Sequence, residues 1–279
     1  MPSILITTVA SSASALGPSP AKAITGVEAV HFDGSTYLET ANFPTISPDR
    51  YGLLSFWFNV SSVGGYYTIL EIGGPVYNAV NIFLSPDIFV TTLQDNSTNL
   101  MWRECDILAS YDGNWHHVLL SWDTQNSACL AYLDDSAISM ADPDNHSTGV
   151  VNAVGYGSAF VARVGGAIFG NNKYTGDLAE VFFLAGTYVD ITDPNVRLGF
   201  RRPSGEPVRN GMNGTTALGD QPQIFLFGNS STFTNNYKDG EWDLLGNYLD
   251  EEGPNEFEVS VGTLTTALTD PWGGEASGF

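Results

Sequence analysis

The stretch LLSFWFNV, residues 53–60, decides the fold class of this chain. From Leu54 to Val60 every second residue is large and apolar, whereas Ser55 and Asn59 fall at positions between them. Successive side chains of a β-strand point to opposite faces, so this alternation predicts a strand with one face in a core and the other toward solvent. We therefore expect a half-buried strand here.

Further short strands are expected on both sides of this stretch. Apolar or β-branched runs bounded by Gly, Asn, Asp and Pro predict them, at residues 29–32, 36–39, 67–72, 81–84, 88–93, 100–105, 115–122, 128–133, 159–164, 178–184 and 223–227. The one helical turn expected is residues 193–200, with Thr192 or Asp193 as N-cap and Pro194 at the first position. Short strands without long helices predict an all-β, antiparallel jelly-roll sandwich, in which two sheets bury their apolar faces against each other.

The composition agrees with this fold and excludes some classes of binding partner. The chain has 279 residues, 43% of them hydrophobic, which can fill one large sandwich or two small domains. It holds 10 Lys and Arg against 31 Asp and Glu, a net charge of −21 that repels nucleic acid and anionic membrane surfaces. No segment approaches the roughly 20 apolar residues that a membrane-spanning helix needs. We expect no nucleic acid partner and no membrane insertion.

Three segments of the chain differ in amino-acid composition. Residues 1–26 are rich in Ser, Ala, Thr and Pro and are expected to form an arm or linker. Their short apolar run at 4–6 lacks the basic flank of a secretory signal peptide. Residues 27–203 are expected to form the sandwich. Residues 204–279, richer in Gly, Asn, Thr and acid, are expected either to pack on the sandwich as edge strands or to form a second interaction arm.

Several motifs, taken in order, resemble those of laminin-G-like, concanavalin A-like lectin domains. HFDGSTYL at 31–38 looks like the opening strand pair of that family, and LSFWF at 54–58 is similar to its second core strand. The most specific match is GNWHHV at 113–118, followed by SWD at 121–123 and AYLD at 131–134, which resembles the central hairpin. GDLAEV at 176–181 looks like the closing strand. The resemblance covers residues 27–201 and implies a lectin-like jelly roll.

Two departures from the family pattern concern a metal site. Ala179 stands where an Asp is usual, and Asp135 follows Asp134 where a Gly is usual. No metal ligands are therefore carried over to this chain. The resemblance still leaves calcium open, because such domains often hold one at the rim with Asp carboxylates and backbone carbonyls, oxygen ligands that Ca²⁺ prefers.

The common catalytic patterns are not found. A glycoside hydrolase needs paired carboxylates, yet there is no Glu-x-Asp-x-Glu, and Glu180 is expected to be a polar residue on the solvent face of its strand. The segment 142–146 lacks the glycine of a calcium loop, residues 155–160 lack the third glycine of a dinucleotide motif, and no Gly-x-Ser-x-Gly elbow occurs. We assign no catalytic or cofactor-binding residues and expect the protein not to be an enzyme.

The remaining reactive residues are expected to be structural. Adjacent side chains of a strand point to opposite faces, so His116 and His117 cannot chelate one ion together. Cys105 and Cys129 lack zinc-site spacing and are expected to be free thiols. Aromatic rings near turns could stack on a sugar or pack in the sheets, and they are Tyr66, Tyr67, Tyr77, Tyr156, Tyr174 and Tyr188. Glycosylation sequons occur at Asn59, Asn96, Asn145, Asn213 and Asn229.

Three hypotheses for function follow. The segment QPQIFLFG at 221–228 and the Asn-rich residues after it are similar to extensions of such domains in bacteriophage structural proteins. The first hypothesis is therefore a non-enzymatic virion protein, a capsid decoration, head fibre or tail attachment component. It would assemble in the host cytoplasm with other virion proteins and copies of itself, and bind a host-surface glycan. The second is an extracellular glycan-binding module, secreted or on a cell surface, and the third is a glycanase.

Overall fold

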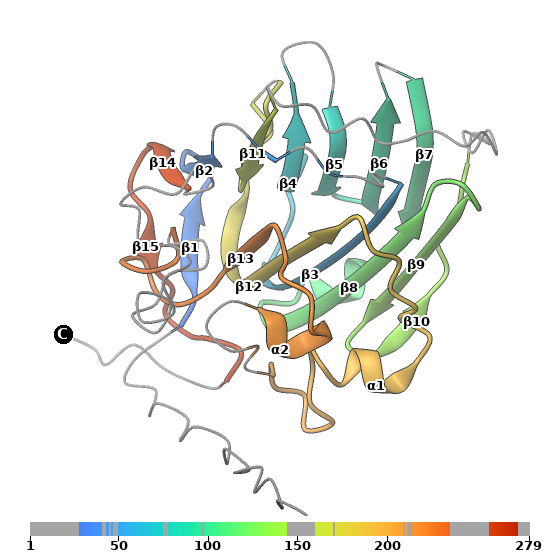
Figure 1. Ribbon diagram of the computed structural model, residues 1–279. Coiled ribbons are helices and arrows are strands. Elements are labelled where there is room, and N and C mark those ends of the chain that lie inside the picture. Colours follow the sequence, from blue (N-terminus) through green and yellow to red (C-terminus); the bar gives the residue numbers. More distant parts are fainter. Residues whose placement is uncertain are drawn as a thin grey trace, which may run out of the picture.

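The computed structural model is a sandwich of two antiparallel sheets (Figure 1). It describes residues 28–40, 43–44, 46, 50–74, 78–95, 98–143, 160–169, 171–208, 210, 214–234 and 257–272. The arm predicted at 1–26 lies outside this part of the chain. The fold class predicted from the alternating apolar pattern is confirmed.

The first sheet, sheet A, has the strand order β10-β9-β8-β3-β12-β1-β15, and β13 also pairs with β12. Its strands are β1 (Val30–Asp33), β3 (Tyr51–Asn59), β8 (Trp115–Asp123), β9 (Ala128–Leu133), β10 (Ser136–Ile138), β12 (Thr175–Ala185), β13 (Ile224–Leu226) and β15 (Thr265–Thr266). The central hairpin predicted from residues 113–134 is the β8–β9 pair.

The second sheet, sheet B, has the order β14-β2-β11-β4-β5-β6-β7. Its strands are β2 (Tyr37–Thr40), β4 (Tyr67–Gly73), β5 (Asn78–Leu84), β6 (Phe89–Asp95), β7 (Thr98–Cys105), β11 (Val161–Val164) and β14 (Glu258–Val261). Each strand predicted from the sequence overlaps one of these strands or those of sheet A. The strands that were not predicted are β10, β14 and β15.

Strand β3 is buried on both faces, so the prediction of a half-buried strand was wrong. Leu54 and Phe58 point into the core between the sheets, as expected. On the outer face, however, Leu53 and Trp57 are also buried, at 0% and 2% exposure, and so is Ser55. The chain after β12 folds back over this face, and its apolar side chains form a second core there.

This second core explains why the outer face of sheet A excludes water. It joins Leu53, Leu119, Phe182 and Leu184 of the sheet to Val189, Ile191, Phe200 and Phe225. The covering segment contains two short helices, α1 (Pro194–Arg197) and α2 (Thr215–Leu218). They lie beside this sheet in Figure 1. Asp193 caps α1 by accepting a hydrogen bond from the Asn195 N–H, as predicted, whereas α2 was not predicted.

A β-bulge in β12 overturns the expectation for Glu180. The pairing of β12 with β3 shifts register between Ala179 and Phe182, and Glu180 takes a positive φ of 50° within that shift. Its side chain is 6% exposed instead of facing solvent. A bulge inserts a residue that breaks the strict alternation of faces, and the outer face here is itself covered, so the pattern-based placement failed.

The chain after residue 256 supplies an edge strand to each sheet. β14 pairs with β2 at one end of sheet B, and β15 pairs with β1 at the end of sheet A. The backbone N–H of Glu28 donates to the Asp270 carboxylate at 2.9 Å, so the first and last described segments meet. The other described part of the C-terminal region, residues 214–234, packs on sheet A. Among the described helices, none is long and apolar enough to cross a bilayer.

Candidate functional site

The two adjacent histidines lie on opposite faces of β8, in the arrangement expected from strand geometry. His117 is 3% exposed on the outer face of sheet A, where its Nε2 lies 2.8 Å from Ser55 Oγ and its ring stacks on Trp57 at 4.9 Å. Burial lowers the pKa of His117 to about 3, so the ring is neutral. With Ser55 also buried, this Ser–His pair cannot meet a substrate and serves packing.

His116 instead ties two turns together. Its Nδ1 lies 2.6 Å from Asp134 Oδ2 and its Nε2 lies 3.1 Å from Asp112 Oδ1. The hydrogen bond to Asp134 is the main cause that raises the pKa of His116, while burial opposes it. Asp134 also accepts a hydrogen bond from the His117 backbone N–H at 3.0 Å. The cluster therefore clamps the turn before β8 to the turn between β9 and β10.

The β9–β10 turn accounts for one departure from the family pattern. Asp134 and Asp135 both take positive φ values, 51° and 67°. Two consecutive residues of this kind make the tight hairpin turn that Gly, Asn and Asp tolerate best. Asp135, where a Gly is usual, instead uses its carboxylate to bind Arg197 of α1. The substitution adds a link between the hairpin and the helix.

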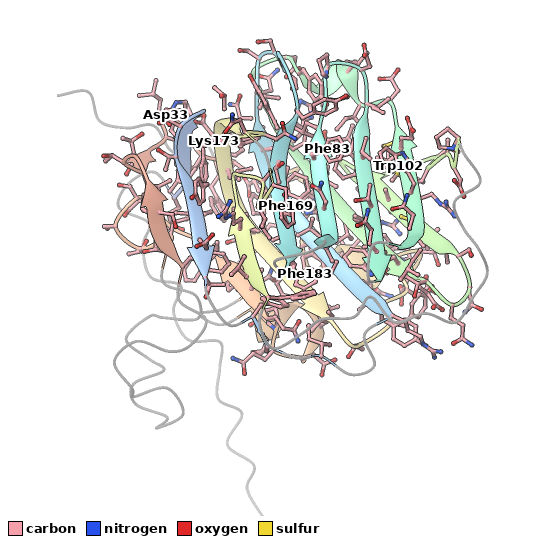
Figure 2. The ribbon with its side chains drawn as sticks, turned by 90° about the horizontal axis from the view of Figure 1, so that it is seen from above. Asp33, Phe83, Trp102, Phe169, Lys173 and Phe183 are labelled. Atoms are coloured by element: carbon pink, nitrogen blue, oxygen red, sulfur yellow. The ribbon has the colours of Figure 1, made fainter. Side chains whose placement is uncertain are left out.

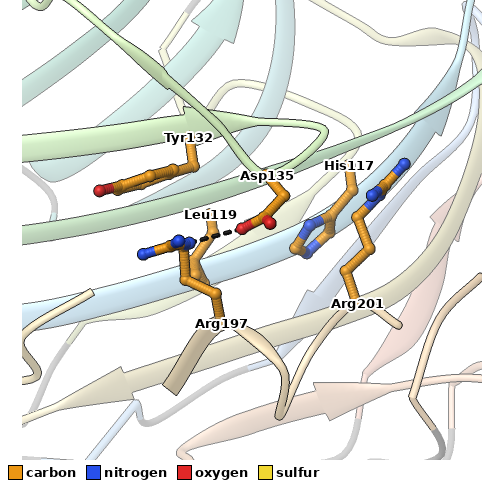
Figure 3. A pocket seen from close by; sticks show the side chains of 6 residues that line it. All are labelled: His117, Leu119, Tyr132, Asp135, Arg197 and Arg201. Carbon is orange, nitrogen blue, oxygen red and sulfur yellow. Dashed lines mark hydrogen bonds and ion pairs between the residues drawn. The ribbon is translucent and has the colours of Figure 1, made fainter. Parts of the chain in front are cut away.

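A small surface hollow lies between this turn and α1 (Figure 3). It is lined by His117, Leu119, Tyr132, Asp135, Arg197 and Arg201. The Arg197 guanidinium is held by Asp135, donates to the carbonyls of Ile191 and Thr192, and lies over the Tyr132 ring at 4.3 Å. Arg201 Nε has no hydrogen-bond partner among the described residues and lies 3.7 Å from Asp134 Oδ1. The Arg197 contacts make the hollow a structural junction, and we do not assign a ligand to it.

The outer face of sheet B has a different character. Its outward side chains come from strands β4 to β7 and from the loops beside them. We define the outer B face as Tyr66, Thr68, Glu71, Asn81, Phe83, Trp102, Glu104 and Phe169. Strand register places Glu71 directly opposite Asn81, and Thr68 opposite Phe83. The pairs are nearest neighbours across the sheet, so one ligand could contact several of these side chains.

Three polar atoms on this face are buried and have no hydrogen-bond partner among the described residues. They are Thr68 Oγ1, Glu71 Oε1 and Asn81 Oδ1. Buried polar groups in folded proteins are nearly always paired, and each exception needs an explanation such as a bound water, ion or ligand. The three come from two adjacent strands, β4 and β5, so one explanation can cover all of them. This cluster is the main anomaly of the outer B face.

Glu71 is the most perturbed group of the cluster. It is fully buried, and its other carboxylate oxygen accepts the Ile168 N–H at 3.0 Å. Burial raises the pKa of Glu71 to about 7, while backbone hydrogen bonding from Ile168, the positive charge of Arg163 and the Phe169 backbone oppose that rise. The hydrogen bond attaches the loop after β11 to the face. This loop carries Phe169 at 46% exposure.

Aromatic rings surround the polar cluster. Tyr66 is 56% exposed and meets Phe83 edge to face at 5.5 Å. Trp102 is partly exposed, and its Nε1–H donates to Glu104 at 2.9 Å, which fixes the indole against the sheet. Phe169, Phe83 and Trp102 follow one another across the sheet in Figure 2. The outer B face thus combines unpaired polar atoms with aromatic surface.

The other residues singled out in the sequence are placed as follows. Cys105 and Cys129 are free thiols, and burial raises the pKa of each to about 12. Asp142 pairs with Arg103 at 2.7 Å instead of opening a calcium loop.

Tyr67 and Tyr174 pack in the core, whereas Tyr66 and Tyr188 are exposed. Tyr77, Tyr156, Asn96, Asn145, Asn213 and residues 155–159 lie outside the described residues. No group of three or more His, Cys, Asp or Glu able to hold a metal occurs among the described side chains.

Sequence reasoning missed the outer B face. Glu71 and Asn81 were not singled out, and Thr68 was named only as part of a strand. One signal was present: Glu71 is a lone acid within the otherwise apolar run YTILEIG of β4. A carboxylate at such a position is either solvent-facing or buried for a purpose, and the sequence alone does not separate the two.

Comparison with known proteins tests the fold. No protein-family model and no curated protein sequence matches the chain. A solved structure from Bacteroides ovatus, described as a candidate carbohydrate-binding protein, matches with a TM-score of 0.50 at 13% identity, over 87% of this chain and 60% of that one. This chain has the concanavalin A-like fold.

Two further structures are similar at lower scores. A heptameric pentraxin from Limulus polyphemus gives a TM-score of 0.47 at 13% identity, over 86% of this chain and 95% of that one. Domains LG4-5 of the mouse laminin α1 chain give 0.45 at 12% identity, over 61% of this chain and 44% of that one. The concanavalin A-like jelly-roll sandwich inferred from the motifs is confirmed as a fold by the Bacteroides ovatus structure. At these identities the comparisons establish nothing finer.

Proposed function

We propose that this domain is a non-enzymatic glycan-binding module and that a saccharide binds on its outer B face. The observation that carries the proposal is the cluster of three buried, unpaired polar atoms, on Thr68, Glu71 and Asn81, next to exposed aromatic rings. Binding sites commonly combine apolar and aromatic surface with a few convergent polar groups. The polar atoms gain partners only when a ligand or solvent provides them.

A saccharide suits both parts of this face. Its hydroxyl groups donate and accept hydrogen bonds, and they can satisfy Asn81 Oδ1, which belongs to the partly exposed residue of the cluster. The C–H surface of a sugar ring is apolar and can pack on Tyr66, Phe169 or Trp102. The Bacteroides ovatus protein of similar fold, described as a candidate carbohydrate-binding protein, supports this assignment.

A catalytic role is less well supported, although the same fold also occurs in hydrolases. Glu71, the carboxyl whose pKa would suit a general acid, is fully buried, and the Ile168 backbone occupies one of its oxygens. Glu39, on the other side of Arg163 in the sheet, is ion-paired with that arginine. Neither carboxyl is placed to protonate a glycosidic oxygen or to attack a sugar. We therefore propose binding without hydrolysis.

The test is a glycan array followed by calorimetric titration of the best ligand, comparing wild type with Tyr66→Ala and Asn81→Ala. We expect each substitution to weaken binding at least about tenfold, because stacking on an aromatic ring or a buried hydrogen bond is lost. Tyr188→Ala is the matched control: it removes another exposed tyrosine, 44% accessible, that packs on Tyr51 away from this face. Equal losses in all variants, or no glycan bound by wild type, would reject the proposal.

A virion role is a second proposal, and it concerns assembly. Val259 on the edge strand β14 and Leu268 beyond β15 are 38% and 79% exposed. Exposed sheet edges with apolar side chains favour pairing with another chain. We propose that copies of the domain or other virion proteins dock there, with the particle as its location. Light scattering and electron microscopy of the native material test this, and a free monomer bearing attached glycans would instead favour an extracellular lectin.

A further inference from the structure

We infer that the outer B face accepts uncharged glycans and excludes anionic ones, such as sialylated or sulfated sugars. This inference rests on the proposed function and adds to it the chemical class of the ligand. It follows from two properties of the described side chains: the sign of the charges around the face, and the kind of hydrogen-bonding group that is left unpaired.

The charges on and beside this face are predominantly negative. Glu71 and Glu104 belong to it, and Glu39 lies on the neighbouring strand β2. The cation of the same sheet face, Arg163, is committed elsewhere: it pairs with Glu39, donates to the Ala167 carbonyl at 2.6 Å and lies over the Tyr37 ring at 4.5 Å.

The second cation nearby is Lys173, which is also engaged. Its Nζ donates to the Ser35 carbonyl at 2.8 Å and lies 5.5 Å from the centre of the Tyr37 ring. Arg163 lies directly opposite Glu71 in the strand register but is paired with Glu39 and lies over Tyr37, and Lys173 lies beside the same ring. Within the described residues, the part of the face between Tyr66 and Trp102 presents no lysine or arginine. An anionic sugar would find no counter-ion there.

The unpaired atoms point to the same ligand class. Asn81 Oδ1 is an acceptor, Glu71 Oε1 is an acceptor whenever the carboxyl is ionised, and Thr68 Oγ1 can act either way. A sugar hydroxyl can donate to Asn81 Oδ1, which belongs to a partly exposed residue, whereas Thr68 and Glu71 lie buried behind it. A sialic carboxylate or a sulfate group offers only acceptors, so that group cannot itself pair with Asn81 Oδ1, and it adds repulsion from Glu104.

The whole-chain charge works in the same direction. At a net charge of −21, the protein repels anions at long range as well as at the face. Salt weakens this long-range contribution, since the screening length is about 10 Å at 0.1 M and about 3 Å at 1 M. The local and global contributions can therefore be separated by varying the salt concentration and by mutating single charges.

The experiment uses an array of neutral oligosaccharides, each printed beside its sialylated or sulfated counterpart, with lactose and 3′-sialyllactose as one pair. Hits are then titrated calorimetrically. We expect binding of neutral members only, with each charged counterpart at least about tenfold weaker, and a smaller gap in about 1 M salt. An anionic member bound as tightly as its neutral partner would overturn the inference and leave the proposed function standing. Failure to bind any glycan would overturn the proposed function and the inference together.

A pair of charge-neutralising variants locates the effect. Glu104→Gln removes one negative charge from the face and keeps the acceptor for Trp102 Nε1. Glu206→Gln removes the same charge from an exposed site where Glu206 faces Arg202 at 3.6 Å. We expect the ratio of neutral to anionic affinity to fall severalfold in Glu104→Gln and to stay within about twofold of wild type in Glu206→Gln. Equal shifts in both variants would assign the discrimination to net charge and reject a role for the face.

Discussion

Glu71 illustrates how a single buried group links binding and stability. Its folded pKa of about 7 lies above the ordinary value of 4.5. A raised acid pKa means that the folded state holds the proton more tightly than the unfolded state does. The contribution of Glu71 to stability is therefore greatest below about pH 4.5, falls as pH rises toward 7 and is constant above that.

The first prediction is that Glu71→Gln removes this pH dependence. The amide keeps an acceptor for the Ile168 N–H but cannot ionise. At about pH 8 we expect the variant to be more stable than wild type by roughly 3 kcal/mol, at about 1.4 kcal/mol per pKa unit, and at about pH 4 to be nearly equal. Urea unfolding at the two pH values measures the difference. A constant difference across pH would show that the carboxyl is not titrating in this range.

The second prediction concerns His116, whose pKa is also raised, here by hydrogen bonds to carboxylates. Its pKa is raised by Asp134 and Asp112, so the stabilisation is fully present below the unfolded pKa of 6.5 and is lost as pH rises through the folded value. We expect His116→Asn to lose more stability at about pH 5.5 than at about pH 9. Thermal unfolding of both proteins at both pH values is the measurement. A larger loss of stability at about pH 9 than at about pH 5.5 would contradict a stabilising interaction of protonated His116 with Asp134 and Asp112.

At the scale of the element, β3 and β8 depend on one close approach. A Cβ added at Gly52 of β3 would lie 2.1 Å from the buried Trp122 ring on β8. The third prediction is that Gly52→Ala destabilises the protein by about 3 kcal/mol or more, because an indole in a packed core cannot move aside. Gly65→Ala is the control, with nothing within 4 Å of the added atom. Denaturant unfolding that placed both variants near wild type would show that the strands can separate locally.

The elements also show what local sequence can predict. The strand β3 follows from alternating apolar residues, and β8 and β9 follow from apolar runs bounded by turn residues, signals contained within each stretch. β15 consists of Thr265 and Thr266, which carry no such pattern, and it exists because β1, far earlier in the chain, offers a free edge. The burial of Leu53 on the outer face depends likewise on residues after β12. Contacts between distant segments determine both features, so patterns within a short stretch of sequence could not predict them.

The sequence could predict that a sheet face of this fold would carry a binding site, but not which residues of the outer B face would form it. The lectin-like resemblance directs attention to sheet faces, and Tyr66 was correctly singled out as a ring near a turn. The pairing of Glu71 with Asn81 depends on the register of β4 against β5, which includes two irregularities, after Thr68 and after Ile72. Such shifts move side chains between faces and cannot be derived from alternation alone.

At the scale of the whole molecule, charge repulsion opposes the compact state. The fourth prediction is that salt stabilises this protein: with a net charge of −21, raising ionic strength from about 10 mM to about 0.5 M should increase the midpoint of thermal unfolding. Sodium chloride is the appropriate salt, since sulfate also strengthens apolar burial. A midpoint that fell with added sodium chloride would mean that ion pairs such as Arg163–Glu39 outweigh the repulsion.

The C-terminal edge strands have a consequence for synthesis. β1 and β2 leave the ribosome first, yet their partners β15 and β14 come from residues 258–266, and the bond from Glu28 to Asp270 joins positions 242 residues apart. At about 5 to 20 residues per second, these two early strands wait on the order of ten seconds or more with open backbone edges. During that interval a neighbouring nascent chain competes for the same hydrogen bonds, so the yield of native protein should depend on how quickly translation reaches its final segment.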